Sequence, residues 1–298
     1  MTSPVSISRL RPGLGSPPGC GPDAGCLREF LGNVLVYAVV SPRARGLSIN
    51  VNMNPDKFCN FDCAYCEVNR RPAAPAASLD VGLMADELQR MLELANSGEL
   101  QNFYSYRNTP EDLMRLKHVA LSGDGEPTLC PNFLEALRAV VHVRALGKYP
   151  FFKIVLMTNA TGLDLRQVQD GLKLFTSEDE IWAKLEAGTQ RYMEEVNRPD
   201  CLLDKVLDNI LFVARQRPVI IQSLFPLLHH EEPSVEEIEQ YARRLDDLRR
   251  AGAQIPLVQI YSVTRPPAHP GCRHLPLKTL MRIARQVREI SGLKAEVF

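Results

Sequence analysis

Residues 48–66 of this 298-residue chain place a short apolar run directly before a cluster of three cysteines. They read Ser48-Ile49-Asn50-Val51-Asn52-Met53-Asn54-Pro55-Asp56-Lys57-Phe58-Cys59-Asn60-Phe61-Asp62-Cys63-Ala64-Tyr65-Cys66. The first six residues predict a β-strand, and the Pro-Asp step after it predicts a loop. The cysteines lie in that loop with C-x3-C-x2-C spacing, so we expect the chemistry of the chain at the end of this strand.

Five further runs match this strand in length and in their nearly continuous apolar character. They are His118–Ser122, Lys153–Thr158, Glu180–Leu185, Val219–Phe225 and Leu257–Val263. Continuous rather than alternating apolar residues favour parallel strands that are covered on both faces. Two more runs, Val34–Val40 and Ala295–Phe298, are candidates for an extra strand at either end of this set.

Amphipathic helical patterns lie between the strands. The first covers Leu79–Ala95. The second opens at Pro131 and runs through Val140, the third runs from Ser234 to about Ala251, and the fourth covers Leu277–Ile290. Ser234 resembles a helix cap, and Gly252 and Gly292 predict helix ends. The alternation predicts an α/β fold with a parallel sheet, either doubly wound or an open barrel. In both, the functional site lies at the carboxyl ends of the strands.

Composition and charge fit one globular enzyme-sized domain. The chain is 45% hydrophobic with a net charge of zero, and general nucleic-acid binders are usually basic. We predict a flexible Pro/Gly-rich extension over residues 1–28 and a single domain over residues 29–298. Since no signal peptide is evident and Phe30–Val40 is too short to span a bilayer, we expect a cytoplasmic protein without a membrane partner.

The three clustered cysteines indicate a metal site. Thiolates are soft ligands that favour zinc and iron–sulfur clusters. A structural zinc site needs four closed ligands, and no fourth Cys or His lies nearby in the sequence. Cys59, Cys63 and Cys66 can instead bind three corners of a [4Fe–4S] cluster, which leaves one iron open for a substrate. The alternative from a different class is a structural metal or electron-transfer protein, which would supply a fourth ligand.

Three motifs follow the next predicted strands. Gly123-Asp124-Gly125-Glu126 is either an ordinary turn or a ligand loop, because glycine lets a backbone approach a ligand closely. Asn159 could bind a cofactor or substrate, or it could close a local turn. Lys184 and Glu186 share one face of their strand, which suggests an ion pair inside the barrel or contacts to a ribose.

Other polar residues near the predicted strand ends are weaker candidates. Arg198 and Arg265 could each clamp a carboxylate or phosphate, although each is also an ordinary surface residue. His269, Cys272 and His274 could contribute to a second metal site if a distant cysteine joined them.

The C-x3-C-x2-C motif with Tyr65 before its last cysteine resembles the signature of the radical S-adenosylmethionine (SAM) superfamily. The resemblance covers about residues 45–265. It implies a partial (β/α)6 TIM-like barrel, a [4Fe–4S] cluster and bound SAM, whose reductive cleavage yields a 5′-deoxyadenosyl radical that abstracts hydrogen. It also implies cofactor contacts from Tyr65, from residues 123–126 as a Gly-Gly-Glu-like motif, and from Asn159, Lys184 and Glu186.

Within that superfamily, several stretches resemble a group of compact Fe–S oxidoreductases distantly related to the tRNA-wyosine synthases. They are residues 52–57, 124–128, 184–189 and 261–266. The resemblance implies an electron donor such as flavodoxin or ferredoxin. It leaves the substrate open among a tRNA base, a peptide or protein and a small metabolite, and it also allows a radical activase of another enzyme.

Overall fold

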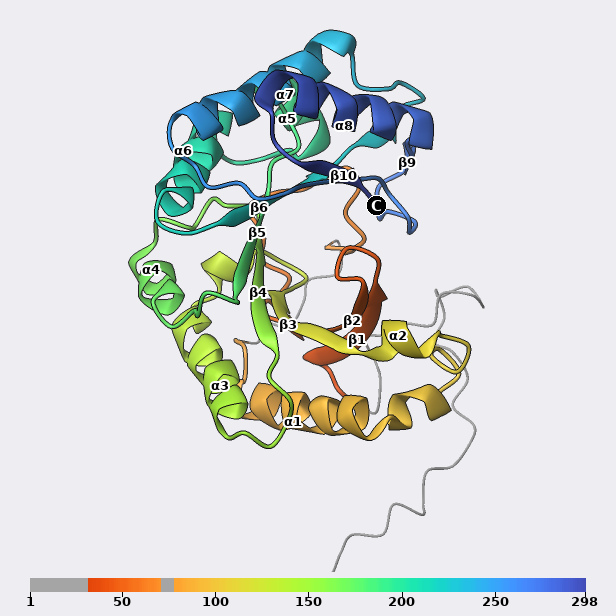
Figure 1. Cartoon of the computed structure of the whole chain (residues 1–298), viewed down its shortest axis with the longest axis vertical. Helices are drawn as coiled ribbons and strands as arrows, with labels where there is room; N and C mark the ends of the chain where they lie inside the picture. Colours follow the sequence, from red (N-terminus) through yellow and green to blue (C-terminus); the bar gives the residue numbers. More distant parts are fainter. Residues whose placement is uncertain (1–31, 71–77) are drawn as a thin grey trace, which may run out of the picture.

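The computed structural model describes residues 32–70 and 78–298, and within them eight strands form one curled sheet (Figure 1). The predicted extension over residues 1–28 lies outside the described residues. The strands of the sheet, in spatial order, are β1 (Val36–Ser41), β2 (Gly46–Asn52), β3 (Leu116–Ser122), β4 (Lys153–Thr158), β5 (Glu180–Lys184), β6 (Val219–Leu224), β8 (Val258–Tyr261) and β10 (Ala295–Val297).

The sheet is a half-barrel of the kind expected for a partial TIM-like fold. Strands β2, β3, β4, β5, β6, β8 and β10 pair in parallel, and β1 is antiparallel to β2. The six predicted strands and both extra strands are confirmed with small shifts at their ends. A separate antiparallel ribbon, β7 (Pro226–Leu228) with β9 (Cys272–His274), was not predicted.

Helices cover the outside of the curl (Figure 1). They are α1 (Val81–Ser97), α2 (Glu111–Met114), α3 (Phe133–Ala145), α4 (Arg166–Leu172), α5 (Gln190–Val196), α6 (Leu203–Ala214), α7 (Val235–Arg250) and α8 (Leu277–Ser291), with short 3-10 turns at η1 (Glu99–Asn102) and η2 (Pro127–Leu129). No helix in the described part of the chain is long and apolar enough to cross a bilayer.

Local capping explains where the predicted helices begin and end. The Ser234 hydroxyl accepts a hydrogen bond from the Glu237 N–H at 3.1 Å, which confirms the predicted start of α7. Gly292 ends α8 with a φ of 69°, as glycine allows. Helix α3 begins at Phe133 rather than at Pro131, because Asn132 occupies the cap position.

The two faces of the sheet differ, which corrects the prediction of strands that are apolar on both faces. In β2, Ile49 and Val51 are fully buried on the outer face against the helices. Their neighbours Ser48 and Asn50 line the inner face together with Gln222 of β6. Since side chains alternate along a strand, the helices cover the apolar residues of the outer face, while the inner face carries polar side chains at β2 and β6 and a small apolar cluster of Ala120, Val155 and Trp182.

Candidate functional site

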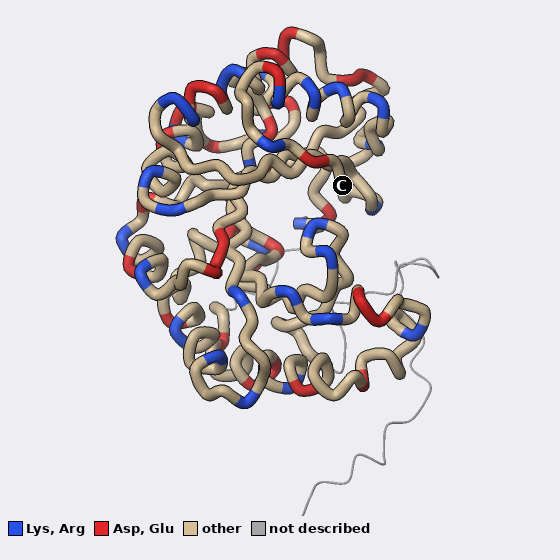
Figure 2. Tube along the Cα trace, viewed as in Figure 1, with Lys and Arg blue, Asp and Glu red and all other residues tan. Residues whose placement is uncertain are grey.

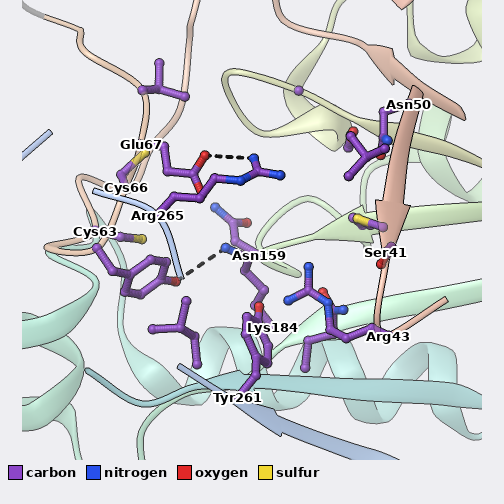
Figure 3. A pocket seen from close by; sticks show the side chains of 18 of the residues that line it. Ser41, Arg43, Asn50, Cys63, Cys66, Glu67, Asn159, Lys184, Tyr261 and Arg265 are labelled. Carbon is purple, nitrogen blue, oxygen red and sulfur yellow. Dashed lines mark hydrogen bonds and ion pairs between the residues drawn. The ribbon is translucent and has the colours of Figure 1, made fainter. Parts of the chain in front are cut away.

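A cavity of about 390 Å³ occupies the inside of the half-barrel. Its wall includes all three cysteines of the predicted cluster loop and, deeper along the strands, Ser48 and Asn50. Figure 3 shows Cys63 and Cys66 on one side of this cavity, with Asn159 and Lys184 between them and the opposite wall. The structure therefore brings the cysteines and the predicted strand-end residues to one cavity.

Backbone hydrogen bonds fix the cysteine loop to its neighbours. The Glu126 N–H donates to the Phe58 carbonyl at 3.0 Å, and the Ala268 N–H donates to the Cys66 carbonyl at 2.7 Å. Gly125 lies against the same loop so closely that a Cβ there would stand 1.7 Å from the Phe58 oxygen. Gly125 is thus required for the contact between the two loops, which a turn alone would not demand.

Each cluster cysteine accepts one N–H hydrogen bond at sulfur. The donors are the Phe61 N–H to Cys59 at 3.4 Å, Asn197 Nδ2 to Cys63 at 3.6 Å, and Arg70 Nη1 to Cys66 at 3.1 Å. Such donors stabilise thiolates and tune clusters bound to them. Neither the Arg70 nor the Asn197 contact was predicted, because each depends on how distant loops pack.

Burial disfavours the charged thiolate form of Cys59 and Cys63. It raises the pKa of the Cys59 thiol and raises that of the Cys63 thiol to about 12. Metal binding replaces the thiol proton and supplies the missing positive charge. The N–H donors at sulfur favour the thiolate form, which is the form that binds iron.

Three cysteines supply the thiols that line the cavity in the described part of the chain. Among the described residues, no three His, Cys, Asp or Glu side chains surround one point where a metal ion could be held. Of the described cysteines, Cys130, Cys201 and Cys272 do not line the cavity. The donor set is thus three thiols around one cavity, which fits a [4Fe–4S] cluster with one iron free of protein ligands.

The loop after β3 places its two carboxylates differently. Glu126 lines the cavity, and its carboxylate accepts hydrogen bonds from the backbone and hydroxyl of Thr128, the hydroxyl of Thr158 and the Asn159 N–H. Asp124 does not line the cavity, and its Oδ2 accepts from Asn52 Nδ2 at 3.1 Å. Burial raises the pKa of Glu126, although the four donors oppose that shift. Glu126 is therefore the carboxylate that faces the cavity, in a fixed orientation.

Asn159 lines the cavity and is held by a second small network. Its Nδ2 donates to Asn60 Oδ1 at 2.9 Å, and its Oδ1 accepts from the Thr161 hydroxyl at 2.7 Å. Because Asn60 lies in the cysteine loop, Asn159 joins that loop to the end of β4. The local turn is present, because Asn159 Oδ1 also accepts from the Thr161 N–H at 3.0 Å, and the contact to a cofactor or substrate stays a prediction.

Lys184 and Glu186 do not pair directly, although they were predicted to share a face. Lys184 Nζ donates to the Tyr65 hydroxyl at 3.4 Å, and that hydroxyl donates to Glu186. Glu186 also accepts from Asn197 Nδ2 at 2.5 Å and lies behind the wall of the main cavity, while Lys184 and Tyr65 line it. Burial alone would lower the pKa of Lys184, but the nearby Glu186 carboxylate raises it, so the ammonium stays charged.

The weaker candidate residues differ in whether they line the cavity. Arg265 lines the cavity but forms an ion pair with Glu67 at 3.1 Å, as Figure 3 shows. Arg198 pairs with Asp62 outside the cavity wall. His269, Cys272 and His274 have different surroundings: His269 contacts Asp62, Cys272 is buried in β9, and His274 contacts the Val263 carbonyl. Within the described residues these three form no metal site.

Comparison with known proteins places this geometry in a family. The profile described as "Radical SAM superfamily" matches residues 53–245. A UPF0026 protein of Helicobacter pylori is 29% identical over 182 residues, which cover 59% of this chain and 51% of that protein. A UPF0026 protein of Methanocaldococcus jannaschii is 24% identical over 192 residues, covering 59% and 49%. The chain thus matches about half the length of these relatives.

Solved structures share the fold. Streptococcus suis SuiB bound to S-adenosylmethionine has a TM-score of 0.55 at 15% identity, covering 82% of this chain and 49% of SuiB. TYW1 with a lysine–pyruvate adduct has a TM-score of 0.54 at 15% identity, covering 92% and 80%. A spore photoproduct lyase variant has a TM-score of 0.53 at 9% identity, covering 83% and 75%.

The profile match spans well over half of the chain, and it contains the cysteine loop and the ends of β3, β4 and β5 at the cavity. The chain belongs to the radical SAM superfamily, whose enzymes use a [4Fe–4S] cluster and S-adenosylmethionine.

Proposed function

We propose that Cys59, Cys63 and Cys66 would hold three irons of a [4Fe–4S] cluster and would leave its fourth iron free to bind SAM. When bound and reduced, the cluster would supply one electron for the cleavage of SAM to methionine and a 5′-deoxyadenosyl radical, and a hydrogen atom taken from a substrate in the cavity would convert that radical to 5′-deoxyadenosine. The protein's own contribution is to position these groups and to exclude water.

We assign the remaining positions of the site by where they lie. Glu126 is a candidate acceptor for the SAM amine, because its carboxylate faces the cavity and four hydrogen bonds prevent it from rotating. Gly123 and Gly125 keep that part of the wall free of side chains, and Asp124 supports the loop through Asn52. Such preorganised groups cost no rearrangement when the ligand binds.

The second set of contacts lies at the end of β5. Tyr65 and Lys184 face the cavity. Glu186 lies behind the cavity wall and accepts a hydrogen bond from the Tyr65 hydroxyl. We propose that Lys184 and Asn159 contact SAM or the substrate, while Glu186 acts as a positioning residue. Its Oε1 is buried without a hydrogen-bond partner among the described residues, so a water in the small cavity beside it would complete it.

A single observation carries this proposal: three thiols of one loop, each accepting an N–H hydrogen bond at sulfur, share a cavity that no other described cysteine lines. A fourth cysteine ligand would favour an electron carrier with a fully ligated cluster. The arrangement instead supports a cluster with an iron available to SAM.

The test is SAM cleavage by the full chain. We would reconstitute the protein anaerobically with iron and sulfide, reduce it with dithionite, add SAM, and quantify 5′-deoxyadenosine by chromatography and mass spectrometry. We expect product from the natural sequence and none from Cys63→Ala. A Cys130→Ala variant is the matched control, because Cys130 is buried outside the cavity. Equal product from all three proteins would refute the assignment of the cluster ligands.

The substrate is a separate question. The mixed charges of the outer surface favour a molecule that enters the cavity over a large polyanion. Figure 2 shows Lys and Arg interspersed with Asp and Glu along the outer helices. A polyanion usually requires a basic surface. A tRNA base is the second candidate, since the likeness to TYW1 covers 92% of this chain. Binding of bulk tRNA that weakens steeply with added salt would favour the tRNA candidate, and no binding at low salt would remove it.

A further inference from the structure

Arg43 is a cation on the cavity wall for which the described residues supply no carboxylate. It lies in the turn between β1 and β2, and its guanidinium carbon stands 4.1 Å from the centre of the Tyr261 ring. That ring face is its recorded partner, and no ion pair or hydrogen bond of its side chain is found within the described residues. In Figure 3 Arg43 and Ser41 lie on the opposite side of the cavity from Cys63 and Cys66.

Each of the other cations of the cavity wall already has a polar partner. Arg265 pairs with Glu67 at 3.1 Å. Arg70 donates to the Cys66 sulfur at 3.1 Å and to the Asp124 carbonyl at 3.0 Å. Lys184 donates to the Tyr65 hydroxyl near the Glu186 carboxylate. Arg43, on the side of the cavity away from the cysteines, is therefore the cation of the described wall that has no polar partner.

The turn that carries Arg43 is held in place. The Arg45 N–H donates to the Pro42 carbonyl at 3.0 Å, and the Ala44 N–H donates to the Ser41 hydroxyl at 3.3 Å. Arg45 then reaches across to β10, where it pairs with Glu296 at 2.8 Å. These contacts connect the two edges of the half-barrel. They also fix the backbone of Arg43, which reduces the entropy that a ligand would lose on binding.

The neighbouring inner wall is polar and contributes no acid. Ser48, Asn50 and Gln222 line this part of the cavity. Gln222 Nε2 donates to Gln259 Oε1 at 2.9 Å, which fixes the orientation of this neutral side chain. Glu180, on the inner face of β5, is paired with Lys153 at 2.5 Å. An anion that enters here meets amide and hydroxyl groups, and within the described residues no carboxylate forms an ion pair with Arg43.

We infer that the substrate carries a carboxylate or phosphate group that binds Arg43, with Tyr261 supporting the other face of the guanidinium. The planar guanidinium suits two parallel hydrogen bonds to either anion, and stacking on an aromatic ring leaves its edge free for them. A substrate held there extends toward the cysteine side of the cavity. The anion site itself does not depend on the proposed function. Only the assignment of the bound anion to the substrate rests on it.

The test measures whether anions protect Arg43 from chemical modification in the reconstituted full-length protein. Phenylglyoxal reacts with accessible guanidinium groups, and peptide mass spectrometry reports the modified fraction of each arginine. Inorganic phosphate and acetate are the two probes, with chloride at equal ionic strength as the reference and S-adenosylmethionine alone as a further arm. Arg45 is the internal control, because it lies two residues away, is exposed, and is paired with Glu296.

We expect phosphate or acetate to slow modification of Arg43 about threefold at twice its dissociation constant, with Arg45 unaffected. The probe that protects better identifies the anion class. No protection beyond chloride, or equal protection at Arg45, would overturn the inference. Protection by S-adenosylmethionine but by neither anion would assign Arg43 to the cofactor and overturn it as well. Because the readout needs no SAM cleavage, its failure is distinguishable from failure of the proposed function.

Discussion

The inner and outer faces of the curled sheet are made by the same strands, yet neighbouring residues on the two faces have different kinds of side chain. In β6, Ile221 is fully buried on the outer face beneath the helices, while the next residue, Gln222, lies on the inner face and lines the cavity. The outer face gains its stability from excluding water, whereas the inner face keeps polar groups for a ligand. Substitutions on the two faces should therefore separate stability from function.

The largest effect is expected where the inner wall meets the cysteine loop. In Gly125→Ala, the new Cβ would stand 1.7 Å from the Phe58 carbonyl oxygen, so one of the two loops must move. We expect a loss of about 3 kcal/mol or more in the free energy of unfolding and loss of most of the iron after reconstitution. Gly82→Ala is the control, because its Cβ would make only a 3.4 Å contact in α1. Full iron content in Gly125→Ala would show that the loops are not coupled.

The two faces can be compared directly in β6. Ile221→Ala should lower the free energy of unfolding by about 2–5 kcal/mol, since it leaves a cavity in the apolar core. Gln222→Ala should cost only about 1 kcal/mol, because it removes one side-chain hydrogen bond to Gln259 next to the cavity. Urea titrations monitored by circular dichroism measure both values. If the two substitutions cost the same, the contrast between the faces is wrong.

The sequence predicted what depends on local pattern, and it missed what depends on the curl. The spacing of Cys59, Cys63 and Cys66 lies within one loop, so it is visible in the chain itself. Arg43 and Tyr261 come from opposite ends of the sequence and meet only because the sheet bends. The polar inner face was also missed, because isolated polar residues inside apolar runs do not distinguish a lined cavity from a packed core.

Some signals were present in the sequence and went unused. Helix α6 carries Leu203, Val206, Leu207 and Ile210 at helical spacing and was not predicted. By contrast, α5 is short and has only two buried residues, Met193 and Val196, so its pattern is weak. The pairing of Glu186 with Tyr65 rather than with Lys184 required the position of the cysteine loop, which strand periodicity does not contain.

An effect that grows as the pH falls is expected from one buried group at the amino end of the inner face. His118 shares a hydrogen bond of 2.8 Å with the Ser48 hydroxyl, and its ring packs edge-on against Trp182. Burial, with help from the charges of Lys153 and Arg43, lowers its pKa from 6.5 to about 3. The folded chain therefore resists the proton that the unfolded chain takes up below pH 6.5.

We expect this group to make no difference to the pH dependence of stability above pH 6.5, where the imidazole is neutral in both states. Below that pH it should reduce the free energy of unfolding by about 1.4 kcal/mol per pH unit, down to about pH 3. Unfolding titrations of the natural sequence and of His118→Gln, which cannot be protonated, isolate this contribution. Identical slopes for the two proteins below pH 6.5 would contradict the assignment.

The smallest effect is expected at the edge between the two faces. Arg45 pairs with Glu296 across the opening of the half-barrel, but its side chain is 72% exposed. Arg45→Gln should therefore change the free energy of unfolding by less than about 1 kcal/mol, with less effect at high salt. Thermal melts at low and high ionic strength test this. A larger loss would mean that this pair, and not the sheet, closes the half-barrel.

The most direct test of the central claim is the electron paramagnetic resonance spectrum of the dithionite-reduced, reconstituted protein with and without S-adenosylmethionine. If three cysteines leave one iron free for that molecule, its addition should change the spectrum of a protein that holds about four irons. The spectrum of Cys130→Ala should change in the same way, whereas Cys63→Ala should hold no intact cluster. An unchanged spectrum would mean that every iron already has a protein ligand, and it would contradict the account.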